Sequence, residues 1–182
     1  IFADFNAGYR KELPKGMADP DEKTVLALWE ETLEQLVCPD YRLTIQQKQR
    51  IQISLKFLMT AAMERSAERL CQEFFDVFMK WFDGSKELDE DSIFYLLDTI
   101  FTMPIELCAK DERLEKLVDF ALSHMNHPSE KVRIAAIRVL KVLTGALKAD
   151  HTCYARVCEA AKAMNPDSIT MLFLQYRIFT NL

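Results

Sequence analysis

The chain has 182 residues, 49% of them hydrophobic and 28% charged, and its formal net charge is −5 at pH 7. This length and hydrophobicity allow a sizeable buried core, whereas the acidic balance argues against a general nucleic-acid-binding role. Only four glycines occur, and no run alternates convincingly between polar and apolar residues, which argues against a β-sheet. We therefore expect an all-α fold.

Helical periodicity after a short lead-in predicts eight helices. Residues 1–18 contain two of the four glycines and are expected to form an extended or partly helical lead-in. Helix start signals lie at several predicted boundaries, namely Asp19-Pro20-Asp21 at the first helix, Thr44 at the second, Asp89 at the fourth and Asn165-Pro166-Asp167 at the last. The expected helices cover residues 21–37, 44–64, 67–82, 90–102, 112–125, 129–147, 151–163 and 167–180. Consecutive helices form four antiparallel pairs, which are the units 20–64, 66–103, 111–147 and 150–181 of a repeat domain over 19–182.

The third unit carries the strongest pattern. Its first helix places apolar residues at three- and four-residue spacings, and Pro128 then interrupts this helix while suiting the first turn of the next. The stripe of the first helix consists of Leu114, Leu117, Val118, Ala121 and Leu122, and the second helix carries Val132, Ala136, Leu140 and Leu143.

This unit resembles a HEAT repeat, in which a turn proline leads into a second helix with the pattern V-R-x-x-A-x-x-x-L. The matching residues are Pro128, Val132, Arg133, Ala136 and Leu140. The resemblance implies an all-α, right-handed α-solenoid of about four HEAT-like antiparallel helix pairs, and it assigns Arg133 to contacts between repeats. The family usually has an aspartate near the turn, where this chain has Asn126 and His127.

Apolar positions recur along the chain with a period of 42 to 44 residues. In the second helices, Ile51, Leu55 and Leu58 recur as Ile93, Leu97 and Ile100, as Ala136, Leu140 and Leu143, and as Leu172, Tyr176 and Phe179. In the first helices, Leu26, Leu70, Leu114 and Val157 recur in the same way. A single helix pair cannot bury its own apolar face, so stacked units are expected. A compact all-α bundle is the alternative.

The sequence offers no recognisable catalytic or metal-binding constellation. The five cysteines are scattered along predicted helices, and we expect reduced core thiols. His124 and His127 form an H-x-x-H without a further ligand nearby, which is typical of a polar turn. No nucleotide-binding or hydrolase motif occurs. We therefore expect no enzymatic activity, no metal and no cofactor.

Charge is distributed unevenly among the predicted helices. The second helices of the first and third units are basic, and in HEAT-like stacks the second helices line the concave surface. The resemblance therefore implies a groove with two basic stripes, suited to an acidic or phosphorylated peptide. The candidate binding residues there are Lys48, Lys56, Lys131, Arg138 and Lys141. Helix 90–102 is acidic and interrupts this pattern, and ordinary solvated charge is the alternative.

The last predicted helix is strongly apolar, with one charged residue among the last fifteen. Because solenoids usually end in a polar cap, we expect a partner helix, a second copy or a further part of a longer protein to cover it. The candidate contact residues are Phe173, Tyr176 and Phe179, and self-association through this helix is one option. Gln175, Tyr176 and Arg177 interrupt segment 169–182, which is also too short to span a bilayer. The N-terminus is not signal-like, so we expect an intracellular protein of the cytoplasm or nucleus.

Together these features predict a non-enzymatic scaffold that binds a peptide segment or a helix of a partner protein within a larger complex. Two alternatives stay open. A nucleic-acid-binding solenoid would use the same basic stripes on phosphates, with affinity that falls steeply with salt. A tubulin-binding array of the TOG kind would carry a tryptophan in the loop 38–43, whereas Trp29 and Trp81 both lie in predicted helices.

Overall fold

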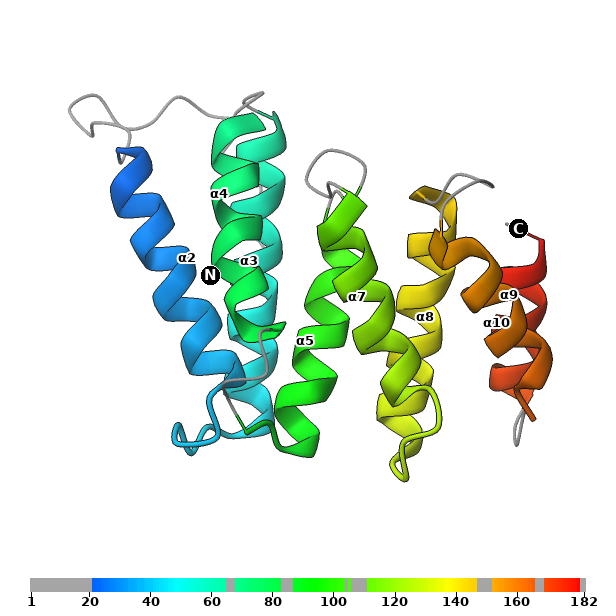
Figure 1. The fold of residues 1–182 in the computed structure, drawn as a ribbon. Helices are drawn as coiled ribbons and strands as arrows, with labels where there is room; N and C mark the ends of the chain where they lie inside the picture. The colour runs from blue at the N-terminus through cyan, green and yellow to red at the C-terminus, as the bar shows by residue number, and fades with distance from the viewer. Residues whose placement is uncertain are drawn as a thin grey trace.

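The computed structural model describes residues 21–64, 68–82, 87–103, 105, 111–146, 152–165 and 169–180. The regular structure of these residues is helical, without a strand among them, which confirms the predicted all-α class (Figure 1). The elements are α2 (Glu22–Val37), α3 (Ile45–Glu64), α4 (Glu68–Met79), the 3₁₀ turn η1 (Lys80–Phe82), α5 (Glu90–Thr102), α7 (Asp111–His124), α8 (Glu130–Ala146), α9 (Thr152–Ala163) and α10 (Ile169–Phe179).

The helix ends lie within two residues of the predicted ones, apart from the third helix, whose last turn is the 3₁₀ turn η1. Local capping explains three of the starts. The Asp21 carboxylate accepts a hydrogen bond from the Thr24 amide at 2.8 Å, and the Asp89 carboxylate accepts one from the Ser92 amide at 2.7 Å. Thr44 forms a capping box with Gln47, with bonds of 2.8 and 3.3 Å. The predicted lead-in 1–18 lies outside the described residues.

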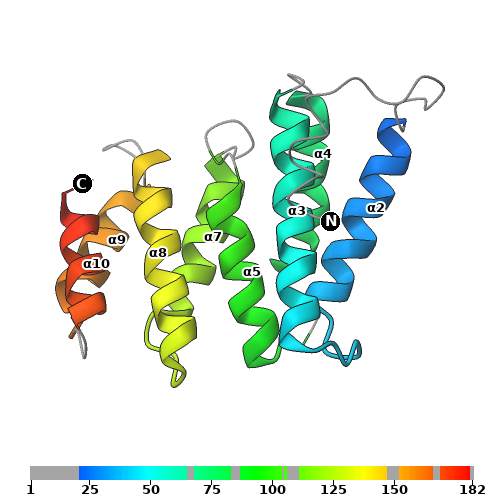
Figure 2. The same ribbon diagram turned by 180° about the vertical axis from the view of Figure 1, so that it is seen from behind.

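The helices lie in two layers, which Figures 1 and 2 show from opposite sides. The first layer contains α2, α4, α7 and α9, and the second layer contains α3, α5, α8 and α10. Along the second layer each helix contacts the next, and α8 packs against both α5 and α10. In the first layer α2 contacts α4, η1 contacts α7, and α7 contacts α9. Each of these layers therefore runs as one row of neighbouring helices.

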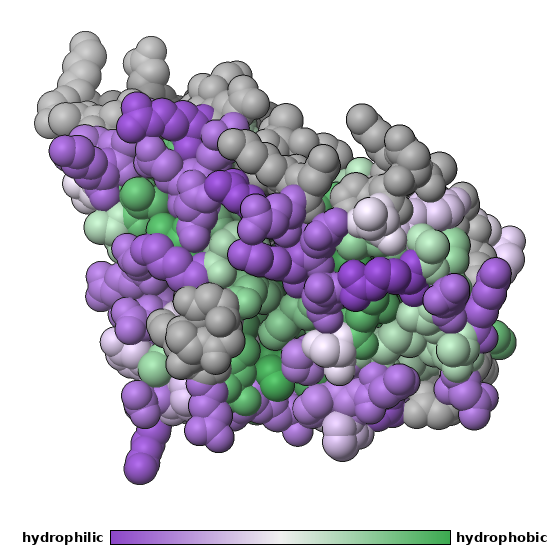
Figure 3. Space-filling model, viewed as in Figure 1, coloured by the Kyte–Doolittle hydropathy of each residue, from purple (hydrophilic) through white to green (hydrophobic). Residues whose placement is uncertain are grey.

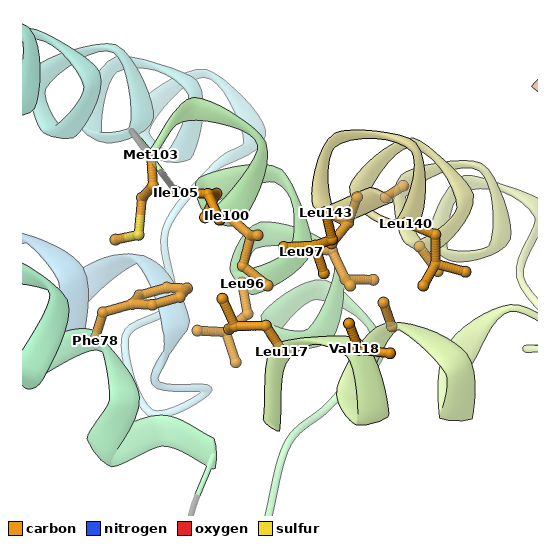
Figure 4. Packing of buried hydrophobic residues seen from close by; sticks show 14 of the residues in the cluster. Phe78, Leu96, Leu97, Ile100, Met103, Ile105, Leu117, Val118, Leu140 and Leu143 are labelled. Atoms are coloured by element: carbon orange, nitrogen blue, oxygen red, sulfur yellow. The ribbon is translucent and has the colours of Figure 1, made fainter. Parts of the chain in front are cut away.

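The hydrophobic core lies between the two layers. Figure 4 shows Phe78 of α4 beside Leu96 of α5 and Leu117 of α7, with Leu97 beside Leu143 of α8. All five side chains are fully buried. The recurring apolar positions of the second and third units are buried as the period predicts, since Ile93, Leu97, Ile100, Ala136, Leu140 and Leu143 are all core residues.

The fourth set of recurring positions departs from this pattern. Leu172 and Tyr176, which the period aligns with core residues, are exposed, while Met171, Leu174 and Ile178 form the buried face of α10. Because α10 is apolar around most of its circumference, its sequence has no contrast that marks the inward side. Contacts with α8 and α9 set the rotation of this helix instead.

An ion pair between the first-layer helices recurs with the repeat period. Arg113 of α7 pairs with Asp76 of α4, and Arg156 of α9 pairs with Asp119 of α7 at 2.5 Å. The two aspartates are 43 residues apart, and so are the two arginines. The same pair of residue types thus joins successive first-layer helices at equivalent positions, a polar regularity that the apolar period alone did not reveal.

None of the described helices combines the length and the apolar character that crossing a lipid bilayer requires.

Candidate interaction surface

The second layer brings the oppositely charged helices together. Lys48 and Lys56 lie on α3, and Lys131, Arg138 and Lys141 lie on α8, as expected for second helices. The acidic helix α5 lies between these two basic helices and contacts both. In the sequence, the acidic helix 90–102 interrupts the basic pattern. In the structure this helix is α5, and the basic helices α3 and α8 pack on either side of it.

Asp91 of α5 forms the first bridge across the layer. Its carboxylate lies 3.3 Å from the Lys48 ammonium of α3 and 2.7 Å from the Lys131 ammonium of α8. Lys131 also pairs with Glu90 at 2.9 Å, and the Ser129 hydroxyl donates to Glu90 at 3.0 Å. Only 10% of the Lys48 side chain is exposed. One carboxylate thus joins three neighbouring helices of the second layer.

The ion pairs of this bridge shift the pKa values of their members in the directions that keep each group charged. Hydrogen bonding from Lys131 lowers the pKa of both Asp91 and Glu90 below their ordinary values. The same contacts, led by the bond to Asp91, raise the pKa of Lys131 above its ordinary value. All three groups are therefore charged around neutral pH, and the bridge is an ion-pair network.

Asp98 forms the second bridge, two turns further along α5. Its carboxylate accepts a hydrogen bond from Gln52 of α3 and lies 3.8 Å from the Arg138 guanidinium of α8. Burial raises the pKa of Asp98, against the opposing effect of Arg138. The Arg138 guanidinium also stacks over the Phe101 ring, 4.4 Å from its centre.

Three of the five predicted cations thus contact α5. Lys48 and Lys131 also lie over the rings of Tyr95 and Phe94, at 5.2 and 5.8 Å. Their binding to a partner stays a prediction, but these contacts give Lys48, Lys131 and Arg138 a role within the fold. The signal was present in the sequence, because Asp91 and Asp98 are seven residues apart, as are Lys131 and Arg138.

Lys56 differs from these cations. It is exposed, and its ammonium forms no close ion pair with a carboxylate in the described ranges, although its charge helps to oppose the raised pKa of Asp98. It borders a shallow hollow of about 230 Å³ on the outer side of the second layer. The hollow is lined by Gln52, Ile53, Lys56, Asp98, Phe101 and Arg138. Lys141, the fifth predicted cation, is half-buried on α8.

Seven of the nine large exposed apolar side chains in the described ranges lie on helices of the second layer. Those of the second layer are Ile45, Ile53 and Met63 of α3, Phe101 of α5, and Leu172, Phe173 and Tyr176 of α10. Among the described residues, Leu28 is the only large exposed apolar residue on a first-layer helix, and Tyr41 lies in the loop after α2. Figure 3 views the first-layer side, where hydrophilic side chains cover much of the helices and apolar surface shows in strips between them.

The predicted contact residues of α10 are partly described. Phe173 is 59% exposed and Tyr176 is 62% exposed, beside Leu172 at 56%. The side chain of Phe179 lies outside the described residues. The predicted contact residues Phe173 and Tyr176 are thus exposed, although the repeat period had aligned Tyr176 with core residues. Sequence reasoning missed Ile53 and Phe101, because each lies among other apolar residues of its helix and the sequence does not show which of them face outward.

The predicted turn of the third unit has local partners. The Arg133 guanidinium donates to the carbonyl oxygens of His127 and Pro128 at 2.9 and 2.8 Å, so these contacts of Arg133 are made within its own unit. The His127 ring accepts from the Ser129 amide at 3.1 Å, and the His124 ring contacts the Phe120 carbonyl oxygen at 2.7 Å. Within the described ranges, no group of three or more His, Cys, Asp or Glu side chains is arranged to hold a metal ion.

Among the described residues, no disulfide bond joins the cysteines, which are Cys38, Cys71, Cys153 and Cys158, and Cys108 lies outside the described residues. Comparison with known proteins finds no family model, no curated protein and no solved structure that matches this chain.

Proposed function

We propose that this chain is a non-enzymatic helical-repeat scaffold that binds a segment or helix of a partner protein through the outer face of its second layer. The observation that carries the proposal is the placement of exposed apolar side chains. Seven of the nine described lie on α3, α5 and α10, and Ile53 and Phe101 border the same hollow. Exposed apolar groups on a folded surface mark interaction sites when they cluster. A partner that covers Ile53 and Phe101 would remove apolar area from water.

The arrangement of the helices within this proposal is a right-handed, HEAT-like α-solenoid. Its support is the pairing of first-layer and second-layer helices and the recurrence of the Asp76–Arg113 ion pair as Asp119–Arg156 at the repeat period. A rigid row of this kind presents one extended face to a partner. The HEAT-like motif around Pro128 adds to this support.

The nucleic-acid alternative draws less support from the same face. Lys48, Lys131 and Arg138 each contact a carboxylate of α5, so a phosphate backbone would have to compete with these carboxylates for each cation. Competition of that kind weakens the electrostatic term on which non-specific nucleic-acid binding depends. We therefore propose a protein partner.

The proposal can be tested by selecting phage-displayed random peptides on the immobilised full chain. Synthetic versions of the selected peptides are then titrated against wild type and variants by fluorescence polarisation. Ile53→Asp should weaken binding about tenfold, because a charge would replace an apolar anchor at the contact. Leu28→Asp is the matched control, since Leu28 is also a half-exposed apolar helix residue but lies in the first layer.

Selection of no binding peptide would contradict the proposal. Equal loss of affinity with Leu28→Asp and Ile53→Asp would also contradict it, because the second layer would then have no special role. Circular dichroism of both variants checks that they remain folded, as expected for substitutions at exposed helix positions.

A further inference from the structure

We infer that the hollow between α3, α5 and α8 recognises one carboxylate side chain of a partner segment, Glu or Asp, together with an adjacent apolar side chain. This inference rests on the proposed function and names the kind of segment that the second layer takes.

The charged residues at the rim of the hollow favour a negatively charged ligand group. Its rim holds two cations, Lys56 and Arg138, and one carboxylate, Asp98. Gln52 and Arg138 face Asp98, and the charge of Lys56 also attracts this carboxylate without a close ion pair. The rim thus has a net surplus of one positive charge, which complements a single negative charge.

The carboxylate of Asp98 makes the hollow less favourable for a phosphate group than for a carboxylate. A phosphate group carries close to two negative charges near neutral pH and would meet the Asp98 carboxylate at the same rim. A carboxylate carries one charge, which matches the surplus positive charge of the rim with less repulsion from Asp98. The hollow therefore favours Glu or Asp over a phosphorylated residue.

The apolar requirement comes from the other two lining side chains. Ile53 is 61% exposed and Phe101 is 37% exposed, and both border the same hollow as Lys56. The Arg138 guanidinium lies over the Phe101 ring, so a cation and an apolar side chain are adjacent at this rim. A partner side chain that covers Ile53 and Phe101 would also exclude water from the Lys56 contact and strengthen it.

The test uses four degenerate peptide libraries that differ at one central position, fixed as Glu, Gln, Lys or phosphoserine, with leucine fixed nearby. Retention of each library on the immobilised full chain is measured. The wild type should retain the Glu library about fivefold better than the Gln and Lys libraries, and better than the phosphoserine library.

Charge reversal gives the decisive comparison. Lys56→Glu should remove the preference for Glu and reverse it towards Lys. Arg50→Glu is the matched control, because Arg50 is exposed on the same helix but points to a different side, six residues away. It makes the same change in net charge and should leave the preference intact.

The outcomes separate the two proposals. If libraries are retained in an Ile53-dependent manner but Lys56→Glu changes nothing, or the Lys or phosphoserine library is retained best, the carboxylate inference is wrong and the scaffold proposal stands. If no library is retained by the wild type, both are wrong.

Discussion

Ser92 shows how a single side chain ties two units of the fold together. It is fully buried at the start of α5, and its hydroxyl contacts the carbonyl oxygen of Val37 and a carboxylate oxygen of Asp89, the latter at 2.6 Å. Val37 is the last residue of α2, so its carbonyl has no partner further along that helix. Ser92 therefore caps the end of one helix from the first turn of another, 55 residues later.

Replacing Ser92 with alanine should lower the free energy of unfolding by about 1–2 kcal/mol, because the buried Val37 carbonyl would lose its partner. Urea-induced unfolding followed by circular dichroism measures the change. Ser123→Ala is the control, since the Ser123 hydroxyl bonds only locally and is exposed, and it should cost less than about 0.5 kcal/mol. Equal effects of the two substitutions would show that Ser92 is not a special link.

At the scale of the element, α5 joins the other two helices of its neighbourhood, α3 and α8, through its carboxylates. Its carboxylates hold the two basic helices on either side of it, with Asp91 between Lys48 and Lys131 and Asp98 near Arg138. A basic α3 and α8 without this acidic helix would repel one another across the layer. The alternation of basic and acidic helices in the sequence therefore stabilises the packing of α3, α5 and α8, in addition to giving the surface its charge.

Replacing Asp91 with asparagine should lower the free energy of unfolding by about 1–2 kcal/mol at pH 7, because the nearly buried Lys48 would lose its counter-ion while solvent screening moderates the cost. The pKa of Asp91 lies below its ordinary value of 3.8, so its contribution is present above about pH 4. This contribution is lost as the pH falls through the lowered pKa. The difference between wild type and variant should thus shrink towards zero in strong acid.

Asp89→Asn supplies the control for that pH series. Asparagine caps a helix as well as aspartate does, so this change on the same helix should alter stability by a few tenths of a kcal/mol. A difference between wild type and Asp91→Asn that stays constant down to pH 2 would contradict the ion-pair role of Asp91.

At the scale of the whole molecule, ion pairs join neighbouring helices in both layers, and most of the described exposed apolar groups lie on the second layer. Ion pairs such as Asp76–Arg113 join neighbours in the first layer. The second layer adds the open apolar positions Phe101, Phe173 and Tyr176. The second layer is therefore the side from which association with another protein, or with another copy of this chain, is expected.

Self-association through α10 can be measured by light scattering over a concentration series. The wild type is expected to form a concentration-dependent dimer, and Phe173→Asp/Tyr176→Asp should convert it to a folded monomer, because two charges would replace the exposed apolar contact. Leu28→Asp/Tyr41→Asp makes the same charge change at other exposed apolar positions and should keep the dimer. A monomeric wild type at every concentration would rule out this role for α10.

The sequence by itself determined the helices and the core positions of the second and third units, whereas Leu26, Ile51 and Leu58 of the first unit are only partly buried. Caps at Asp21, Thr44 and Asp89 and the spacing of apolar residues act within one or two turns, so helix ends and buried positions such as Leu97 and Leu143 could be predicted locally.

Only the tertiary structure decided which charges meet and which side of an apolar helix is covered. The partners of Asp91 lie 43 and 40 residues away, and a pairing across such distances depends on how helices line up rather than on their own patterns. The inward side of α10 is set by α8 and α9, because a helix that is apolar around most of its circumference gains a similar free energy from burying any of several sides. The hollow beside Lys56 likewise exists only where three helices come together.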